Sequence, residues 1–262
     1  MAKFKKIGVV ADKRKEAQSA LKTLCKKYSL TEITDIEQGK KMDVIVALGG
    51  DGFMLHTLHN YMNYDIPIYG INCGTIGFLM NEYKETNLKA RLEKAGITEI
   101  HPLKMVATTT DGKKHEALAI NEVSLLRATG QAVKIRISVD GKVQLKELVG
   151  DGVLVATAAG STAYNSSVGG PALPLKSNLF ALTPISAFRP RRWNGALLPH
   201  KTTIKFDIIS SKKRPANAVA DFTEVEDVSS VEVKEVRDKK ISLLFDHGHS
   251  LEERIISEQF VY

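Results

Sequence analysis

The sequence predicts an α/β domain followed by an all-β domain. Over roughly the first hundred residues, short apolar runs alternate with segments whose apolar residues recur at helical spacing, which is typical of a parallel sheet covered on both faces. Further along, short β-prone runs follow one another with few helical stretches, which favours an antiparallel, sandwich-like domain. A chain of 262 residues is long enough to bury a core in each.

The first domain is expected to alternate strands with helices. The expected strands are short, apolar and rich in β-branched residues: Lys6–Ala11, Asp43–Leu48 and Pro67–Ile71. The expected helices are Ala17–Tyr28, a segment that begins just after Gly52, and Leu88–Ala95.

The second domain is expected to be built from short strands. Asp111-Gly112 and Asp140-Gly141 are hairpin signals between two pairs of them. The expected strands are Met105–Thr110, Glu116–Ile120, Val133–Val139, Val153–Thr157, Ile204–Ile209, Ala216–Ala220, Ser230–Val236 and Ile241–Phe245. A final helix is expected over Ser250–Phe260, with Ser250 as its cap. The domain boundaries are accordingly placed at 1–100 with 246–262, and at 101–245.

Composition argues against several classes of protein. No run of about 18 apolar residues appears, so no membrane partner is expected, and the start of the chain becomes charged too early for a secretory signal. Cys25 and Cys73 form neither a disulfide framework nor a zinc-site spacing, which favours a cytoplasmic protein. The net charge of +7 is scattered along the chain, so it indicates a basic solvated surface and no nucleic-acid partner.

A glycine-rich turn, Gly49-Gly50-Asp51-Gly52, follows the second expected strand. Ligands of open α/β sheets bind at the carboxyl ends of strands, and glycines let a polyphosphate approach the backbone N–H groups closely. A helix that starts at Phe53 would add partial positive charge. Asp51 could bind a metal or accept a hydrogen bond from an attacking hydroxyl, although a tight turn could also contain Asp without any such role.

Three later stretches have a similar character. Asn72–Leu79 is a glycine-containing loop in which Phe78 offers an aromatic face to a base. Asn121-Glu122 pairs an amide with a carboxylate, which suits two neighbouring hydroxyls of a ribose. Gly150-Asp151-Gly152 leads through an apolar strand into Thr157–Tyr164, a run of small and hydroxyl residues ending in a ring. Taken singly, each stretch also fits ordinary loop or core composition.

Taken together and in this order, these stretches resemble the NAD kinase family over nearly the whole chain. The matching pieces are Gly49–Gly52, Asn72–Leu79, Asn121-Glu122, Gly150–Tyr164, Gly169-Gly170-Pro171 and Leu182–Ile185. The resemblance implies a Rossmann-like N-terminal α/β domain and a C-terminal β-sandwich, with the last helix returning to the first domain. It also implies Mg²⁺-dependent phosphoryl transfer from ATP, or polyphosphate, to the 2′-hydroxyl of the adenosine ribose of NAD, by a homodimer or homotetramer.

The resemblance assigns a role to individual residues. Asp51 resembles the family's catalytic acid, Asn121 and Glu122 resemble the pair that holds the nucleotide, and Asp151 resembles a second acid. The other implied binding residues are Gly50, Gly52, Phe78, Thr162, Ala163, Tyr164 and Ser167. No metal held by protein side chains is implied, because Mg²⁺ would arrive with ATP.

Some positions depart from the family pattern. Ala158 and Ala159 replace a proline and a hydroxyl residue, so one hydrogen bond to the ligand is expected to be missing, and Phe222 follows Asp221 where relatives have glycine or a polar residue. Two alternatives remain: a lipid- or sugar-directed kinase that shares only the glycine turn, and a non-enzymatic dinucleotide-binding protein. The sequence does not separate ATP from polyphosphate as donor, NAD from NADH as acceptor, or dimer from tetramer.

Overall fold

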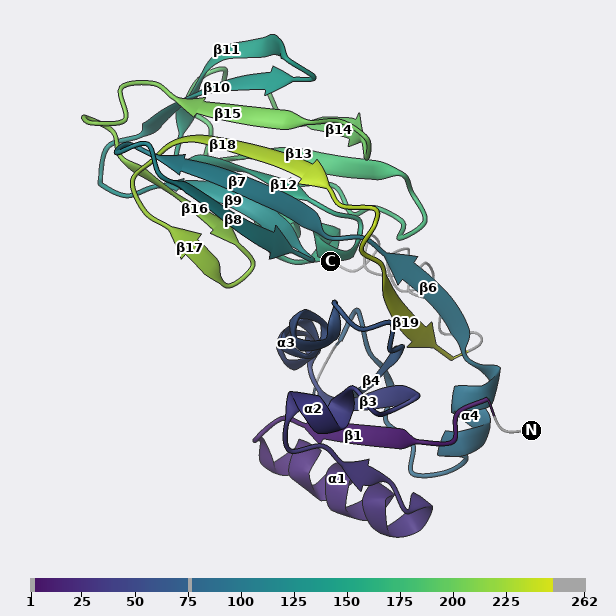
Figure 1. Ribbon diagram of the computed structural model, residues 1–262. Helices are drawn as coiled ribbons and strands as arrows, with labels where there is room; N and C mark the ends of the chain where they lie inside the picture. Colours follow the sequence, from purple (N-terminus) through teal and green to yellow (C-terminus); the bar gives the residue numbers. More distant parts are fainter. Residues whose placement is uncertain (1–2, 75–76, 247–262) are drawn as a thin grey trace. The chain divides into compact units, whose positions relative to one another are not determined.

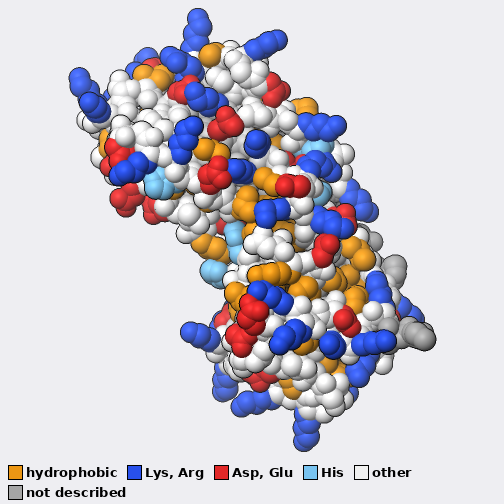
Figure 2. All heavy atoms as spheres, in the orientation of Figure 1, with side chains coloured by type: hydrophobic (Ala, Val, Ile, Leu, Met, Phe, Trp, Pro, Cys, Tyr) orange, Lys and Arg blue, Asp and Glu red, His pale blue; other side chains and the backbone are white. Residues whose placement is uncertain are grey.

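The computed structural model describes residues 3–74 and 77–246, which divide into two compact units (Figure 1). One unit runs to Ile100 and resumes at Asp238, and the other comprises His101–Arg237. In this part of the chain, no helix combines the length and the apolar character that crossing a membrane requires. On the face shown in Figure 2, lysine and arginine side chains are spread over both units with acidic ones among them.

The first unit is built on a twisted sheet that is parallel except at one end. Its described strands run in the order β2-β1-β3-β4-β19-β6, with β5 paired to β4, and only β6 is antiparallel to its neighbour. Their bounds are β1 Ile7–Ala11, β2 Thr31–Glu32, β3 Val44–Gly49, β4 Ile68–Asn72, β5 Asn81–Glu82, β6 Gly96–Ile100 and β19 Ile241–Phe245.

Helices complete this α/β unit, as the sequence predicts. They are α1 Lys15–Tyr28, α2 Ile36–Gly39, α3 Asp51–Tyr61 and α4 Leu88–Lys94. The apolar residues of α1 recur every three or four positions, so Leu21 and Leu24 face the sheet and pack in one buried cluster with Val46 and Leu48 of β3. Burial of such side chains contributes about 1.5–3 kcal/mol each.

The assignment of Ile241–Phe245 to the second domain is wrong. This strand, β19, lies in the sheet of the first unit, where Leu243 pairs in parallel with Ile68 of β4 and the whole strand pairs with β6. An apolar run predicts a strand but does not name its partner. The partner β6 was not predicted, because Gly96–Ile100 is mostly exposed and contains Gly and Glu, which are depleted in strands.

A buried ion pair anchors the end of β19. The guanidinium of Arg91 on α4 lies 2.6 Å from Asp246, and the two side chains are only 11% and 12% exposed. The Tyr69 hydroxyl donates to the same carboxylate at 2.7 Å, and burial raises the pKa of Tyr69. The backbone N–H of Asp246 in turn donates to the Asn81 side chain, so the returning chain is held by several polar contacts. The helix expected over Ser250–Phe260 lies outside the described residues.

The second unit, described throughout, is a β-sandwich of two antiparallel six-stranded sheets (Figure 1). One sheet has the order β11 Lys142–Gly150, β10 Val133–Val139, β15 Ile204–Ile208, β18 Val228–Glu235, β7 Leu103–Thr109 and β8 Lys114–Ala119. The other has the order β14 Ala196–Pro199, β13 Leu179–Ile185, β12 Gly152–Ala156, β9 Glu122–Arg127, β16 Ala216–Ala220 and β17 Thr223–Val225. Side chains from both sheets, among them Ile135 and Val155, form one buried core, so the predicted combination of α/β and all-β domains is confirmed.

The Asp140-Gly141 hairpin forms as predicted. Both residues have positive φ, 49° and 77°, and they connect β10 to β11 where Val139 faces Lys142. A two-residue turn with both φ values positive matches the twist of the flanking strands, and Asp-Gly supplies it at little steric cost.

Candidate active site

Asp51 is the first residue of α3 and anchors a neighbouring loop through its carboxylate. Strand β3 ends at Gly49, and Gly50 is the cap residue of α3. The Phe78 N–H donates to Oδ2 of Asp51 at 2.7 Å, and the Leu79 N–H donates to Oδ1 at 3.0 Å. Charged acceptors strengthen such bonds, so Asp51 fixes the backbone that carries the half-buried Phe78.

The glycines of this turn serve close packing on one side and leave the other side open. A β-carbon at Gly49 would lie 2.8 Å from the ring of Phe53, so only glycine lets this ring pack on the end of β3. A β-carbon at Gly52 would meet nothing within 4 Å, and Gly52 is exposed. The start of α3 is thus accessible to a ligand that seeks backbone N–H groups.

Arg14 lies beside the turn, although it belongs to none of the motifs in the sequence. A β-carbon at Gly50 would lie 3.1 Å from Nη2 of Arg14, and one at Gly74 would lie 3.7 Å from Nη1. The Nε of Arg14 donates to Asp12 at 2.9 Å, which orients the guanidinium. Its place in the basic run Lys13-Arg14-Lys15 suggested only a solvated surface. The cation next to the glycines suits the negative charge of a phosphate chain.

In the second unit, Asp221 holds the turn that carries Asn121 and Glu122. Its carboxylate accepts three consecutive backbone N–H groups, from Ile120 at 2.6 Å, Asn121 at 3.1 Å and Glu122 at 3.2 Å. Asp221 has a φ of 47°, a left-handed conformation that aspartate tolerates better than most residues. Asp221 therefore positions the pair, a role that the sequence did not reveal.

The turn presents two buried acceptors. Asn121 Oδ1 and Glu122 Oε2 accept no hydrogen bond from any residue in the described part of the chain. Burial, and secondly the charge of Asp221, raise the pKa of Glu122 to about 7. Because unsatisfied buried oxygens are costly, a ligand with two adjacent donors, such as neighbouring ribose hydroxyls, fits this place.

The run Thr157–Tyr164 packs directly on the Asn121-Glu122 turn. The Thr157 hydroxyl donates to the Ile120 carbonyl at 2.7 Å and accepts the Gly160 N–H at 3.0 Å. A β-carbon at Gly160 would lie 2.2 Å from the Asn121 carbonyl oxygen, so the contact requires glycine. Two short helices follow, η1 Ala159–Thr162 and α5 Tyr164–Ser167. Thr162, Ala163 and Tyr164, which follow Gly160, are half-buried, Ser167 is exposed at the end of α5, and Ala158 and Ala159 are buried.

Asp151 lies at the opposite end of β12 from this cluster. Gly152 of β12 pairs with Leu126, whereas Ala156 pairs with Glu122. The five residues of β12 span about 16 Å at roughly 3.3 Å per residue. The Nε of Arg127 donates a hydrogen bond to Oδ1 of Asp151 at 2.5 Å. Within one chain, the structure does not bring Asp151 together with Asn121 and Glu122.

Among the described residues, no group of three or more His, Cys, Asp or Glu side chains could hold a metal ion. The fold and the two sets of residues define a two-domain protein with a glycine-rich turn beside a guanidinium in one unit and two buried, unsatisfied acceptor oxygens in the other.

Comparisons with known proteins identify the family. The model of the ATP-NAD kinase N-terminal domain matches residues 4–96, and that of the ATP-NAD kinase C-terminal domain matches residues 120–246. The NAD kinase of Brucella suis is 54% identical over 96% of this chain and 95% of its own length, and that of Rickettsia bellii is 49% identical over 97% and 98%. The chain belongs to the NAD kinase family.

Solved structures agree in fold. Yeast NADH kinase complexed with NADH has a TM-score of 0.81 at 20% identity, with 98% of this chain and 87% of that chain covered. An NAD kinase from Archaeoglobus fulgidus in complex with ATP has a TM-score of 0.76 at 23% identity, with 97% and 98% covered.

Proposed function

We propose that this protein is an NAD kinase that transfers a phosphoryl group from Mg²⁺-bound ATP to the 2′-hydroxyl of the adenosine ribose of NAD, giving NADP. Membership of the family supports the activity. The observation that supports NAD as the phosphoryl acceptor is the pair of buried side-chain oxygens on Asn121 and Glu122. Neither oxygen accepts a hydrogen bond from a described residue, so both are available to ribose hydroxyls. A lipid- or sugar-directed kinase and a purely binding protein are disfavoured, because the relatives are NAD kinases over nearly the full length.

At the NAD site, Asn121 and Glu122 accept hydrogen bonds from ribose hydroxyls. The carboxylate of Asp221 accepts the backbone N–H groups of both residues and so holds them in place. Thr162, Ala163, Tyr164 and Ser167 follow Gly160, whose backbone rests on Asn121, and they line the nucleotide with a mixture of hydroxyl, methyl and ring surface. Phe78 adds an aromatic face on the loop that Asp51 holds.

On the donor side, Gly52 leaves room for a phosphate chain at the start of α3, and Arg14, which lies against Gly50, balances the charge of that chain. The donor would carry Mg²⁺, which would supply charge neutralisation on the phosphate oxygens. Asp51 accepts a hydrogen bond from the 2′-hydroxyl and so positions this hydroxyl for attack on the phosphorus. Because the transition state of phosphoryl transfer is loose, the hydroxyl transfers its proton to Asp51 only late in the reaction. General-base assistance of this kind contributes about 10²–10⁴-fold.

We further propose that the protein works in the cytoplasm as a homodimer or homotetramer. The family resemblance supports this assembly, and Asp151, about 16 Å along β12 from the Asn121-Glu122 turn, is free to face a second copy. Sedimentation of the purified protein tests this assembly, and a monomer at assay concentration would contradict it.

The activity is tested by incubating the purified protein with NAD or NADH, Mg²⁺, and ATP or polyphosphate, and by measuring NADP or NADPH. We expect NADP with ATP and none when Mg²⁺ is removed by chelation. No product with any donor would refute the kinase proposal. Diacylglycerol and simple sugars serve as alternative acceptors, and neither is expected to be phosphorylated.

A further inference from the structure

The side chain of Glu122 lies where the backbone offers it few hydrogen-bond donors. Its Oε2 atom is buried and accepts no hydrogen bond from the described residues. The backbone N–H groups of Ile120, Asn121 and Glu122 all donate to the carboxylate of Asp221 instead. The N–H groups of this turn are therefore not available to the Glu122 carboxylate.

The donors of Thr157, which packs on the same turn, already have acceptors as well. Its N–H donates to the Asn121 carbonyl at 2.9 Å, and its hydroxyl donates to another backbone carbonyl of the turn at 2.7 Å. The turn thus gathers acceptors: Asn121 Oδ1, Glu122 Oε2 and the carboxylate of Asp221. Because unsatisfied buried acceptors are costly, this cluster favours either a bound proton or a ligand that brings donors.

The titratable groups around Glu122 add negative charge and no nearby cation. The strands on both sides of β9, β12 and β16, contain no titratable residue. Asp221 faces Glu122 from the β16–β17 turn, and Tyr164 is the first titratable residue after β12. The cation of β9 is Arg127, at the far end of the strand. Burial, and secondly the charge of Asp221, accordingly raise the pKa of Glu122 to about 7.

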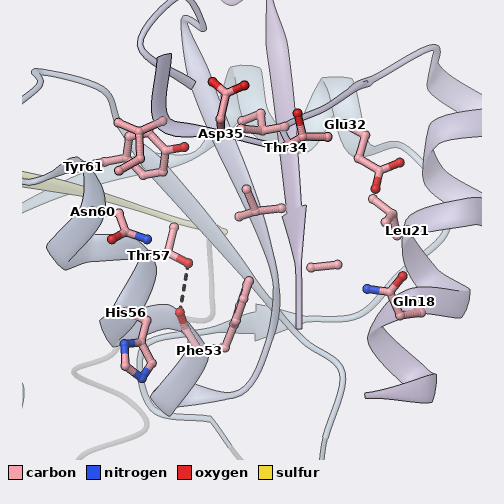
Figure 3. Close-up of a pocket in the computed structure, with 14 residues that line it drawn as sticks. Gln18, Leu21, Glu32, Thr34, Asp35, Phe53, His56, Thr57, Asn60 and Tyr61 are labelled. Atoms are coloured by element: carbon pink, nitrogen blue, oxygen red, sulfur yellow. Dashed lines mark hydrogen bonds between the residues drawn. The ribbon is translucent and has the colours of Figure 1, made fainter. Parts of the chain in front are cut away.

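Two carboxylates of the α/β unit show the contrast. Glu32 and Asp35 line a cavity of about 300 Å³ between α1 and α3, where both residues are exposed to water (Figure 3). Asp35 also accepts the Gln38 N–H at 2.8 Å. Solvent supplies donors to these two carboxylates, whereas the buried oxygen of Glu122 needs a proton or a ligand.

We infer that binding of NAD expels a proton from Glu122, so that the affinity for NAD rises with pH. Without a ligand, the proton keeps the buried side chain neutral beside Asp221. In the complex, two adjacent ribose hydroxyls donate to Asn121 Oδ1 and Glu122 Oε2, and such bonds favour the ionised carboxylate. The O–H bond of the carboxyl group breaks, and the proton passes to solvent. The inference rests on the proposed function and adds a regulation of its NAD site.

The sign of the pH dependence follows from this exchange. Below about pH 7 the free protein holds the proton and must release it to bind NAD, whereas above about pH 7 Glu122 is already ionised. The dissociation constant for NAD is therefore expected to fall about tenfold between pH 6 and pH 8, and to level off at higher pH.

Calorimetric titration with NAD alone counts the protons. The heat of binding is measured in two buffers of different ionisation enthalpy, and its dependence on that enthalpy gives the number of protons released. We expect about one proton per NAD at pH 6 and almost none at pH 8.5. Glu122→Gln, which cannot ionise, is expected to release none at either pH. The matched control is Glu226→Gln, an exposed residue at the other end of the β16–β17 hairpin, which is expected to behave as the wild type.

Binding of NAD at pH 6 without release of a proton, or a release that persists in Glu122→Gln, would overturn the inference. If Glu122→Gln no longer binds NAD, Asp221→Asn decides instead. Loss of the neighbouring negative charge is expected to lower the pH at which release is half complete, and an unchanged midpoint would contradict the inference. A wild-type protein that makes no NADP refutes the proposed function, whereas an active enzyme that binds NAD without releasing a proton refutes this inference alone.

Discussion

The carboxylate of Asp51 accepts the backbone N–H of Phe78 at 2.7 Å, although the two residues are 27 positions apart. The second carboxylate oxygen accepts the Leu79 N–H. Asp51, in the first turn of α3, therefore also holds the loop segment that carries Phe78.

Asp51→Asn tests both roles. The amide keeps one acceptor oxygen but turns its NH₂ group toward the other backbone N–H, so the loop at Phe78 and Leu79 loses one of its two anchoring hydrogen bonds. We expect kcat to fall by at least about 10²-fold and the KM for NAD to rise. Steady-state kinetics check this, with Asp65→Asn on an exposed segment as the matched control. A variant that keeps most of its turnover would contradict the role of Asp51.

Glu122 makes stability depend on pH. Its pKa is raised to about 7 by burial and by Asp221, so between its ordinary value of 4.5 and about 7 the folded protein retains a proton that the unfolded chain releases. Stability therefore falls as pH rises through that window and levels off above it, by up to about 3 kcal/mol.

Urea unfolding of the wild type and Glu122→Gln at pH 5 and pH 7.5 measures this effect. The glutamine variant, which cannot ionise, is expected to gain stability relative to the wild type at the higher pH. If the free energies of unfolding of the two proteins differed by the same amount at both pH values, the pKa of Glu122 would not be raised.

The buried Arg91–Asp246 ion pair is expected to contribute more to the free energy of unfolding than the exposed Lys240–Glu99 pair. Arg91→Met leaves a carboxylate that is 12% exposed without its cation, at a cost of about 3–5 kcal/mol. Lys240→Met removes a pair with Glu99 whose side chains are 46% and 49% exposed, at a cost below about 1 kcal/mol. Urea unfolding followed by circular dichroism at 222 nm, where the helices of the α/β unit absorb, compares the two variants. Similar midpoints would contradict the difference.

Gly160→Ala should damage the nucleotide side of the protein. Its β-carbon would lie 2.2 Å from the Asn121 carbonyl oxygen, so the Thr157–Tyr164 run must move away from Asn121. We expect a raised KM for NAD and a lower melting temperature. Gly130→Ala is the matched control, since its β-carbon would meet nothing within 4 Å. If both variants behaved alike, the close contact would not be required.

Local patterns predicted the elements well because their causes are local. The alternation of β3, the Gly49–Gly52 turn and α3 follows from apolar periodicity and glycine placement, and the Asp140-Gly141 hairpin follows from turn stereochemistry. The family resemblance, which the comparisons confirm, supplied the candidate site residues, and their individual roles remain predictions.

What the sequence did not reveal depends on contacts between distant residues. Asp221 and Asn121 are 100 positions apart, and no pattern links Arg14 to Gly50. The raised pKa of Glu122 requires its burial to be known. The separation of Asp151 from Glu122 likewise depends on the antiparallel pairing of β9 with β12, which sets Glu122 against Ala156 at the far end of the strand.

The position of β19 sets an order on biosynthesis. A ribosome completes the β-sandwich at Arg237, before it has made Ile241–Phe245. Until β19 is made, the sheet lacks the strand that lies between β4 and β6. The α/β unit, although its first strands are made first, is therefore the last to complete its sheet. Nascent chains truncated after Arg237 would therefore carry a finished sandwich behind an unfinished α/β sheet, the reverse of the usual N-terminal-first sequence.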